Sequence, residues 1–262
     1  MWMTVLVSIA VILQSLEFLI LQGRGRIEAA LPLRGLAAEL ERASVFRASF
    51  WNRLFSPAAF IAAQGIRIAL AVLMAVHEAG AGFGSVPVFA PVLAAAQVSL
   101  LLTFYSSLRF GGSFNGGSDS MTLIAQSGLV LGAIHPRTGL LWTGCWAAAS
   151  YFVNGLRKGF HREWWSGKPL AVFAATSPVA MAPVRDFLVR ARWMHKTASI
   201  AVILFQAAFP LLLFSVPGTR FALGAGVVFH LGNFALFGLN RFFWIWVSSY
   251  PAIWHLSEFL RS

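Results

Sequence analysis

Charged residues are scarce in this chain of 262 residues. Asp, Glu, Lys and Arg together make up 11% of the sequence, whereas a soluble domain contains roughly 25%. Hydrophobic residues account for 58% of the chain, and Phe alone occurs 24 times. So little charge is not enough to cover a soluble domain of this size, and the composition therefore predicts an integral membrane protein.

Cysteine and the familiar catalytic motifs are also nearly absent. The single cysteine, Cys145, excludes an internal disulfide, a CxxC redox pair and a cysteine-rich metal site. Because it lies in an apolar run, we expect it to be a small buried hydrophobe. The sequence contains no GxxxxGKS/T phosphate loop, no GxSxG nucleophile elbow and no HExxH motif. Its six histidines are scattered, so their spacing supports no metal site.

Basic residues outnumber acidic ones, and the formal net charge is +11. They gather in residues 23–56 and 158–197, which flank apolar stretches as the cytoplasmic loops of membrane proteins do. This pattern predicts a multi-pass protein, which we expect in a bacterial inner membrane, with its N-terminus outside and both Arg-rich loops in the cytoplasm. No soluble domain remains to bind nucleic acid, so we expect membrane lipids around these charges and no nucleic-acid partner.

Long apolar stretches predict an all-α bundle of seven or eight transmembrane helices. The stretches are residues 2–22, 57–77, 86–108, 121–134, 139–157, 198–216, 221–239 and 242–259. The first has no basic start and no small-residue cleavage site after it, so we expect a retained helix and not a signal peptide. Stretch 121–134 is short for a span and is tilted, re-entrant or extended into residues 117–120. Pro251 should kink or end the last helix.

The segment between the first two spans has a different pattern. Residues 33–55, LRGLAAELERASVFRASFWNRLF, place apolar side chains at helical spacing among arginines. This pattern predicts an amphipathic helix in the lipid headgroup region, and the alternative is a surface that binds a partner protein. We group residues 1–44 as the first helix with the amphipathic segment, and residues 45–262 as the transmembrane domain, in one structural unit.

Two apolar stretches, residues 151–167 and 222–254, carry polar side chains at positions that would lie in the membrane. The residues concerned are Asn154 and Lys158 in the first stretch and His230 and Asn233 in the second. Polar groups are costly in hydrocarbon and by default indicate a functional site. We therefore predict that the two stretches face each other across one polar pocket. Arg67, ten residues into the second span, must be paired or extend to the membrane surface.

Each of these residues also has a plainer interpretation. Lys158 follows Arg157, and a lysine buried beside another cation has a lowered pKa and can act as a neutral-amine base. Alternatively, its amine only extends to the membrane surface. His230 and Asn233 lie on one helical face and either bind a ligand or form hydrogen bonds between helices. The glycine-rich segment 110–120 either lines a cavity or forms a flexible turn.

The same stretches resemble a known family. FHLGNFALFGLNRFFWIWVSSYP at 229–251 resembles a helix of vitamin K-dependent gamma-glutamyl carboxylase, with its pattern F-H-L-x-N-x-x-L-F, an aromatic-rich run and S-S-x-P. YFVNGLRKGFHREWWSG at 151–167 is similar to the carboxylase stretch Y-F-x-x-G-x-K-K, which precedes a Trp and a Gly. ILFQAAFPLLLF at 203–214 looks like a helix of the bacterial relatives called HTTM proteins. The resemblance covers residues 45–255.

This resemblance implies a chemistry and a set of site residues. In the carboxylase, the lysine at the position of Lys158 deprotonates vitamin K hydroquinone, and oxygen then yields a strong base that removes a glutamate proton before carbon dioxide adds. It implies Lys158 and His230 as catalytic residues. The residues that it implies for cofactor binding are Asn115, Asn154, Trp164, Asn233 and Phe242. Because the chain ends at Ser262, we expect no large extracytoplasmic domain, which argues against a peptide substrate.

The sequence therefore predicts a membrane-embedded protein similar to the gamma-carboxylase. It would bind a quinone-type or other lipid-soluble cofactor in a polar pocket with a lysine base, as a quinone-dependent oxidoreductase or a lyase. The alternative is a non-catalytic membrane subunit that anchors a soluble or membrane partner through residues 23–56 and 158–197. A transporter is a third interpretation and would need an ion site in the middle of the membrane, near Arg67.

Overall fold

The computed structural model describes residues 2–30, 32–80, 89–109, 116–176, 183, 186–187, 190–237 and 240–262. Helices and the turns between them make up these residues, and none of them lies in a strand. The chain divides into two compact units, residues 1–139 and residues 140–262. The all-helical class expected from the composition is thus confirmed for the described residues.

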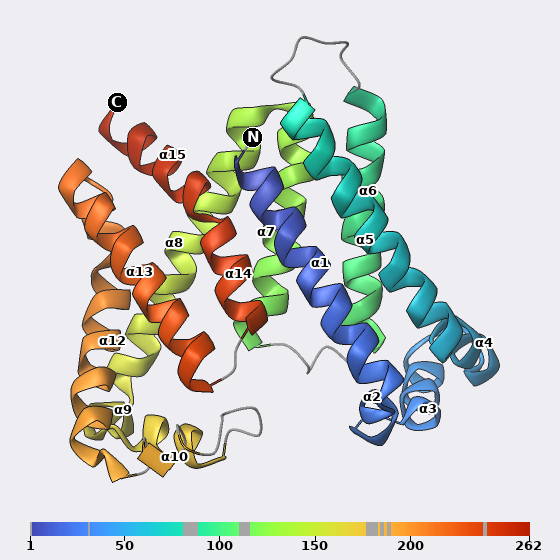
Figure 1. Ribbon diagram of the computed structural model, residues 1–262, viewed down its shortest axis with the longest axis horizontal. Coiled ribbons are helices and arrows are strands. Elements are labelled where there is room, and N and C mark those ends of the chain that lie inside the picture. Colours follow the sequence, from blue (N-terminus) through green and yellow to red (C-terminus); the bar gives the residue numbers. More distant parts are fainter. Residues whose placement is uncertain are drawn as a thin grey trace. The chain divides into compact units, whose positions relative to one another are not determined.

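Unit 1 is a bundle of four long helices (Figure 1). These are α1 (Trp2–Gly23), α5 (Pro57–Gly80), α6 (Phe89–Arg109) and α7 (Gly116–Ile134). Helix α1 packs on α5, α5 on α6 and α6 on α7, while α7 also contacts α1. Apolar clusters such as Phe18 with Ile27 and Phe60 fill the space between them. The short span expected at 121–134 is extended to Gly116 by the first turns of α7, which confirms one of the three alternatives for it.

Three short helices lie at one end of this bundle, beside the ends of α1 and α5 (Figure 1). They are α2 (Arg26–Ala30), α3 (Leu33–Ala43) and α4 (Ala48–Leu54). The prediction of one continuous amphipathic helix over 33–55 was wrong, because the chain is extended at Ser44, with φ −142° and ψ 172°. The Ser44 hydroxyl donates to the Leu40 carbonyl at 2.6 Å and accepts from the Phe46 N–H, and such local bonds compete with a helix.

Unit 2 begins just after the first turn of α8 (Pro136–Phe160) and continues through α9 (Arg162–Ser166) and α10 (Lys168–Thr176). The helices that follow are α12 (Arg192–Leu212), α13 (Val216–Phe237), α14 (Asn240–Ser248) and α15 (Tyr250–Arg261). The break at Ser249 confirms that Pro251 ends a helix, since it lies in the first turn of α15, where a missing N–H costs nothing. Cys145 is exposed on α8, so the expectation that it is buried was wrong.

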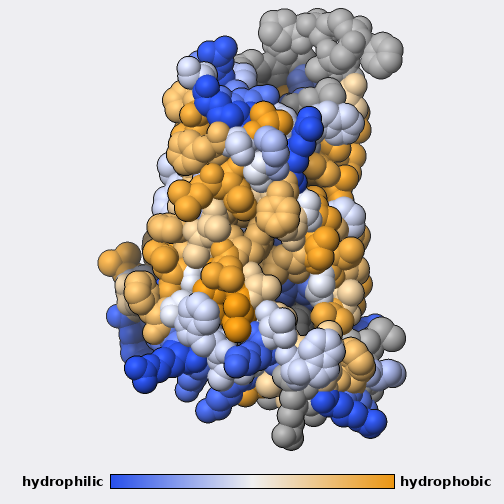
Figure 2. Space-filling model, turned by 90° about the vertical axis from the view of Figure 1, so that its left-hand side faces the viewer, coloured by the Kyte–Doolittle hydropathy of each residue, from blue (hydrophilic) through white to orange (hydrophobic). Residues whose placement is uncertain are grey.

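Four helices of the described residues are long and apolar enough to cross a membrane. They are Trp2–Gly23, Pro57–Ala79, Pro91–Arg109 and Trp193–Leu212. The first three belong to unit 1 and the last to unit 2. Large hydrophobic side chains, among them Leu204, Leu211 and Val228, are exposed on α12 and α13. Figure 2 shows a broad band of hydrophobic side chains on one face, with hydrophilic ones gathered at its two ends, as a membrane-embedded surface requires.

Candidate functional site

One face of α8 carries Tyr151, Gly155 and Lys158, and it packs against α12. A Cβ atom at Gly155 would collide with the backbone of Gln206 and Ala207, so the close contact of these helices depends on glycine. On one side of it, the ring of Tyr151 stacks on Phe209 with centroids 4.0 Å apart. On the other side, Lys158 reaches Gln206. Gly155 thus permits the close packing of α8 on α12 in which Tyr151 meets Phe209 and Lys158 meets Gln206.

His230 of α13 is fully buried beside Tyr151. Its Nε2 lies 2.5 Å from the Tyr151 hydroxyl. Its ring stacks on Trp246 of α14 at 5.3 Å and contacts Phe242 at 4.9 Å. The other ring nitrogen, Nδ1, is buried without a hydrogen-bond partner among the described residues, and so is Nε1 of Trp246. Two ring nitrogens with unused hydrogen-bonding capacity therefore lie in one aromatic cluster.

Tyr250 of α15 completes this cluster, which we call the His230 cluster: Tyr151, His230, Phe242, Trp246 and Tyr250. The hydroxyls of Tyr151 and Tyr250 lie 3.2 Å apart. A Cβ atom at position 226 would collide with the Tyr250 hydroxyl, so Gly226 leaves room for it. Hydrogen-bonding side chains from α8, α13, α14 and α15 thus meet in an otherwise apolar interior.

Lys158 lies just beyond the predicted span 139–157 and is half-buried. Its Nζ donates to the Gln206 side-chain oxygen at 2.9 Å and to the Asn154 carbonyl at 3.4 Å, and it lies 5.1 Å from the centre of the Trp164 ring. Burial, together with the neighbouring positive charge of Arg157, lowers the pKa of Lys158 to about 8. A sizeable fraction of this amine is therefore neutral near physiological pH.

The residues implied by the resemblance lie in the His230 cluster, around Lys158 or in neither of these two groups. His230 and Phe242 belong to the His230 cluster, and Trp164 contacts Lys158. The amides of Asn154 and Asn233 donate within their own helices, to the Ser150 and Phe229 carbonyls. Asn115 lies outside the described residues.

The two groups are separated along α8. Tyr151, which contacts His230, and Lys158 are seven residues apart, a distance of about 10 Å along a helix. Among the described residues, no hydrogen bond joins Lys158 to His230. The stretches 151–167 and 222–254 therefore meet through Tyr151, and Lys158 has its partner on α12 instead.

Sequence reasoning missed Tyr250, Trp246 and the pairing role of Gln206. A signal for the tyrosines was present, since the chain has only three and the hydroxyls of two of them, Tyr151 and Tyr250, meet. Their hydroxyls are among the few polar groups in these apolar stretches. The distance between them along the chain, 99 residues, kept that signal from indicating a contact.

Unit 1 contains a second buried polar cluster, which we call the Arg67 network. The guanidinium of Arg67 on α5 donates to Gln64 at 2.8 Å and to Gln14 of α1 at 2.6 Å. Gln14 in turn donates to Asp119 of α7 at 2.7 Å, and Gln64 donates to Ser106 of α6 at 3.0 Å. Arg67 and Asp119 are both buried and are linked through Gln14. This network explains how an arginine is tolerated in the middle of an apolar helix.

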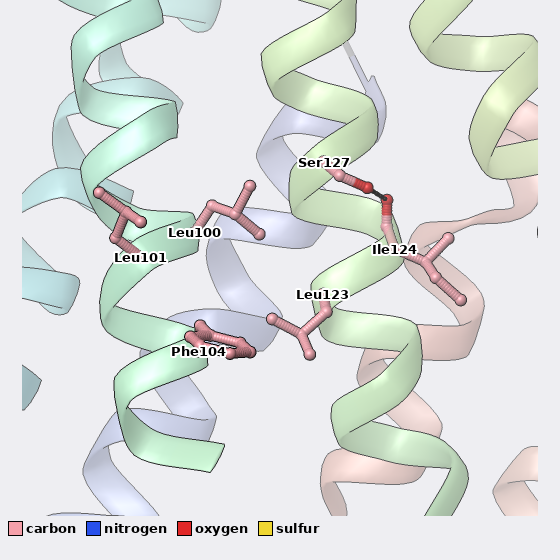
Figure 3. A pocket seen from close by; sticks show the side chains of 6 residues that line it. All are labelled: Leu100, Leu101, Phe104, Leu123, Ile124 and Ser127. Carbon is pink, nitrogen blue, oxygen red and sulfur yellow. Dashed lines mark hydrogen bonds between the residues drawn. The ribbon is translucent and has the colours of Figure 1, made fainter. Parts of the chain in front are cut away.

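A groove between α6 and α7 in unit 1 contains none of the predicted site residues. Figure 3 shows the six side chains that line it, Leu100, Leu101, Phe104, Leu123, Ile124 and Ser127. The Ser127 hydroxyl donates to the Ile124 carbonyl at 2.8 Å, so its hydrogen is already used. Such a lining suits a hydrocarbon chain and has no free donor to orient a polar headgroup.

Long apolar helices with buried polar clusters between them are features of helical membrane proteins. Residues 140–257 match the model of the HTTM domain, the family that the sequence resemblance predicted. The family is related to the gamma-carboxylase, and the match covers nearly all of unit 2. No curated protein and no solved structure matches the chain.

Proposed function

We propose that unit 2 binds a lipid-soluble, quinone-type cofactor at the His230 cluster, in a multi-pass bundle of seven or eight spans, with Lys158 as a base. The observation that carries this proposal is the pair of buried nitrogens, His230 Nδ1 and Trp246 Nε1, for which the described part of the chain offers no hydrogen-bond partner. A buried polar group without a partner is destabilising, on the order of 1–3 kcal/mol. A bound ligand that hydrogen-bonds both nitrogens would remove that cost.

The residues present fit a quinone headgroup. It is a flat ring with oxygen atoms at opposite ends, and it supplies reversible two-electron, two-proton redox chemistry. Trp246 Nε1–H can only donate, so it suits a carbonyl or hydroxyl oxygen, while His230 Nδ1 donates or accepts according to its tautomer. The aromatic rings of Phe242 and Trp246 provide flat apolar surfaces of the kind that bind such rings.

Lys158 has a separate role in this proposal. With its pKa near 8, its neutral amine can accept a proton, and Gln206 holds the Nζ atom in place. Trp164 favours the charged form of the amine, since its ring attracts a cation. Because Lys158 is not in the His230 cluster, we assign binding to that cluster and proton transfer to Lys158, and the two roles are testable separately.

Purification in mild detergent, followed by lipid extraction and mass spectrometry, tests the binding. We expect a quinone at close to one molecule per chain in the wild type. His230→Phe should reduce the affinity for the quinone by roughly tenfold, and with it the amount that co-purifies, because one lost hydrogen bond in a buried site changes affinity by about that factor. The matched control is His255→Gln, which changes a half-buried histidine of α15 that pairs with Glu258 at 3.7 Å.

Two outcomes contradict this proposal. A wild-type protein that carries no quinone, and binds none when a short-chain quinone is added, rules out the binding site. A co-purifying protein partner without a quinone favours the alternative of a membrane anchor. If Lys158→Met binds and turns over a reduced quinone as the wild type does, the base assignment is wrong even though the binding site stands.

A further inference from the structure

The hairpin of α3 and α4 in unit 1 ends in an exposed apolar tip. The tip consists of Val45, Phe46 and Phe50, whose exposed fractions are 95%, 49% and 42%. Its two rings, Phe46 and Phe50, stack on each other at 4.6 Å, and beside them Trp51 Nε1 donates to the Ser44 hydroxyl at 3.2 Å. Clustered and exposed aromatic side chains of this kind mark an interaction surface.

Three exposed arginines surround the tip. Arg42 precedes it at the end of α3, Arg47 lies within its turn, and Arg53 is in the last turn of α4. Guanidinium groups bind phosphate oxygens through paired hydrogen bonds. An apolar tip framed by arginines is complementary to a surface that has phosphates outside and hydrocarbon inside.

The hairpin is anchored to the ends of the apolar helices. Phe55, buried after α4, stacks on Tyr105 of α6 at 5.1 Å, and the Tyr105 hydroxyl donates to the Leu54 carbonyl at 2.8 Å. At the start of α3, the Leu33 N–H donates to Glu28 of α2, which pairs with Arg109 of α6 at 2.8 Å. Figure 1 shows α3 and α4 beside the ends of α1 and α5.

We propose that this hairpin binds anionic phospholipids, with the Val45–Phe46–Phe50 tip inserted between them and Arg42, Arg47 and Arg53 on their phosphates. Helix α5, a candidate span, begins at Pro57, only two residues after Phe55, so the hairpin is held at the level of the headgroups. The position of the hairpin, its positive charge and its apolar tip therefore all fit binding to a membrane surface. This inference concerns unit 1 and does not depend on quinone binding.

Spin labelling tests the insertion. With Cys145, the only cysteine, changed to Ser, Val45→Cys is labelled with a nitroxide and placed in phosphatidylcholine vesicles with and without phosphatidylglycerol. We expect the label to become more accessible to oxygen and less accessible to a water-soluble nickel complex when phosphatidylglycerol is present. The control is Glu39→Cys, an exposed position on α3 whose label should stay accessible to nickel.

Three results would overturn this proposal. The label at position 45 could remain in water with both lipids, which means that the tip does not insert. It could insert equally well without phosphatidylglycerol, which removes the role of anionic lipid. It could also be shielded from oxygen and nickel alike, which indicates a protein contact instead of lipid.

Native mass spectrometry of bound lipid tests the arginines. In the variant R42Q/R47Q/R53Q we expect the affinity for phosphatidylglycerol to fall by up to about a hundredfold, since each basic residue at an anionic membrane surface contributes on the order of fivefold. The matched control, R137Q/R162Q/R190Q, removes three exposed arginines elsewhere in the chain. Equal losses in both variants would mean that net charge alone attracts the lipid, and the hairpin would not be the site.

Discussion

The two units bury polar side chains in different ways. In unit 1 the charged groups of Arg67 and Asp119 are linked through Gln14, in a network that connects α1, α5, α6 and α7. In unit 2 the His230 cluster consists of aromatic rings, and His230 Nδ1 and Trp246 Nε1 bond to nothing among the described residues. Unit 1 also has buried oxygens without a hydrogen-bond partner among the described residues, at Ser8, Ser15 and Gln126, but the side chains of the Arg67 network are hydrogen-bonded to one another.

This difference indicates different roles. Hydrogen bonds between the polar side chains of four helices hold a bundle together. Polar atoms that remain unpaired in a buried aromatic cluster are better explained by a ligand or an ordered water molecule. The family match agrees with this division, since it covers unit 2 and leaves the Arg67 network outside.

The largest effect is expected from Arg67→Met. It removes two buried hydrogen bonds, to Gln64 and Gln14, so we expect a loss of about 3 kcal/mol in the free energy of unfolding. Thermal unfolding in detergent measures this loss, and Arg53→Met, at an exposed arginine, is the control. A similar stability for the two variants would show that the network does not hold unit 1 together.

Gly226→Ala should be the next most damaging change. The added methyl group collides with the Tyr250 hydroxyl, and overpacking of this kind costs about 1–3 kcal/mol. Adding Tyr250→Phe removes the hydroxyl and should restore part of the lost stability. No recovery in the double variant would mean that the ring of Tyr250 is not held in this position.

His230→Phe should have a smaller effect on stability and thereby sharpen the comparison with Arg67. The change removes one hydrogen bond to Tyr151 and also one buried nitrogen without a partner, so the two contributions oppose each other. We expect a change of less than about 1.5 kcal/mol in the free energy of unfolding, together with the loss of bound quinone. A loss as large as that of Arg67→Met would indicate that the His230 cluster is structural as well.

The smallest effect concerns the titration of Lys158. Amines react with acetic anhydride only when neutral, so we expect the reactivity of Lys158 to rise with pH through a midpoint near 8. Arg157→Gln removes a neighbouring positive charge that disfavours the protonated amine, so the midpoint should move to higher pH. Peptide mass spectrometry follows this reaction, with Lys168 and Lys196 as internal references. An unchanged or lower midpoint would contradict the role of Arg157.

Several local features followed from the sequence alone. Scarce charge and long apolar runs predict a helical membrane protein, because hydrocarbon favours segments that satisfy their own backbone hydrogen bonds. Pro251 predicts a helix break because it cannot donate to the preceding turn. The motifs at 151–167 and 229–251 placed the HTTM domain correctly, although the match begins at residue 140 and not at residue 45. The helix predicted over 33–55 was wrong for an equally local reason, because the Ser44 hydroxyl bonds to the Leu40 carbonyl and interrupts the amphipathic segment.

What the tertiary structure decided is which polar side chains meet. Helical periodicity tells which residues share a face, but it does not tell which helix covers that face or in what register. Gln14 meets Arg67 across 53 residues and Tyr151 meets His230 across 79, and no spacing in the sequence predicts either pair. Close contacts at Gly155 and Gly226 set the register that brings Lys158 to Gln206 and Tyr250 to Tyr151. The residue types in each apolar stretch thus predicted a polar site from the sequence, and only the packing of the helices determined that the described residues form two clusters of different kinds.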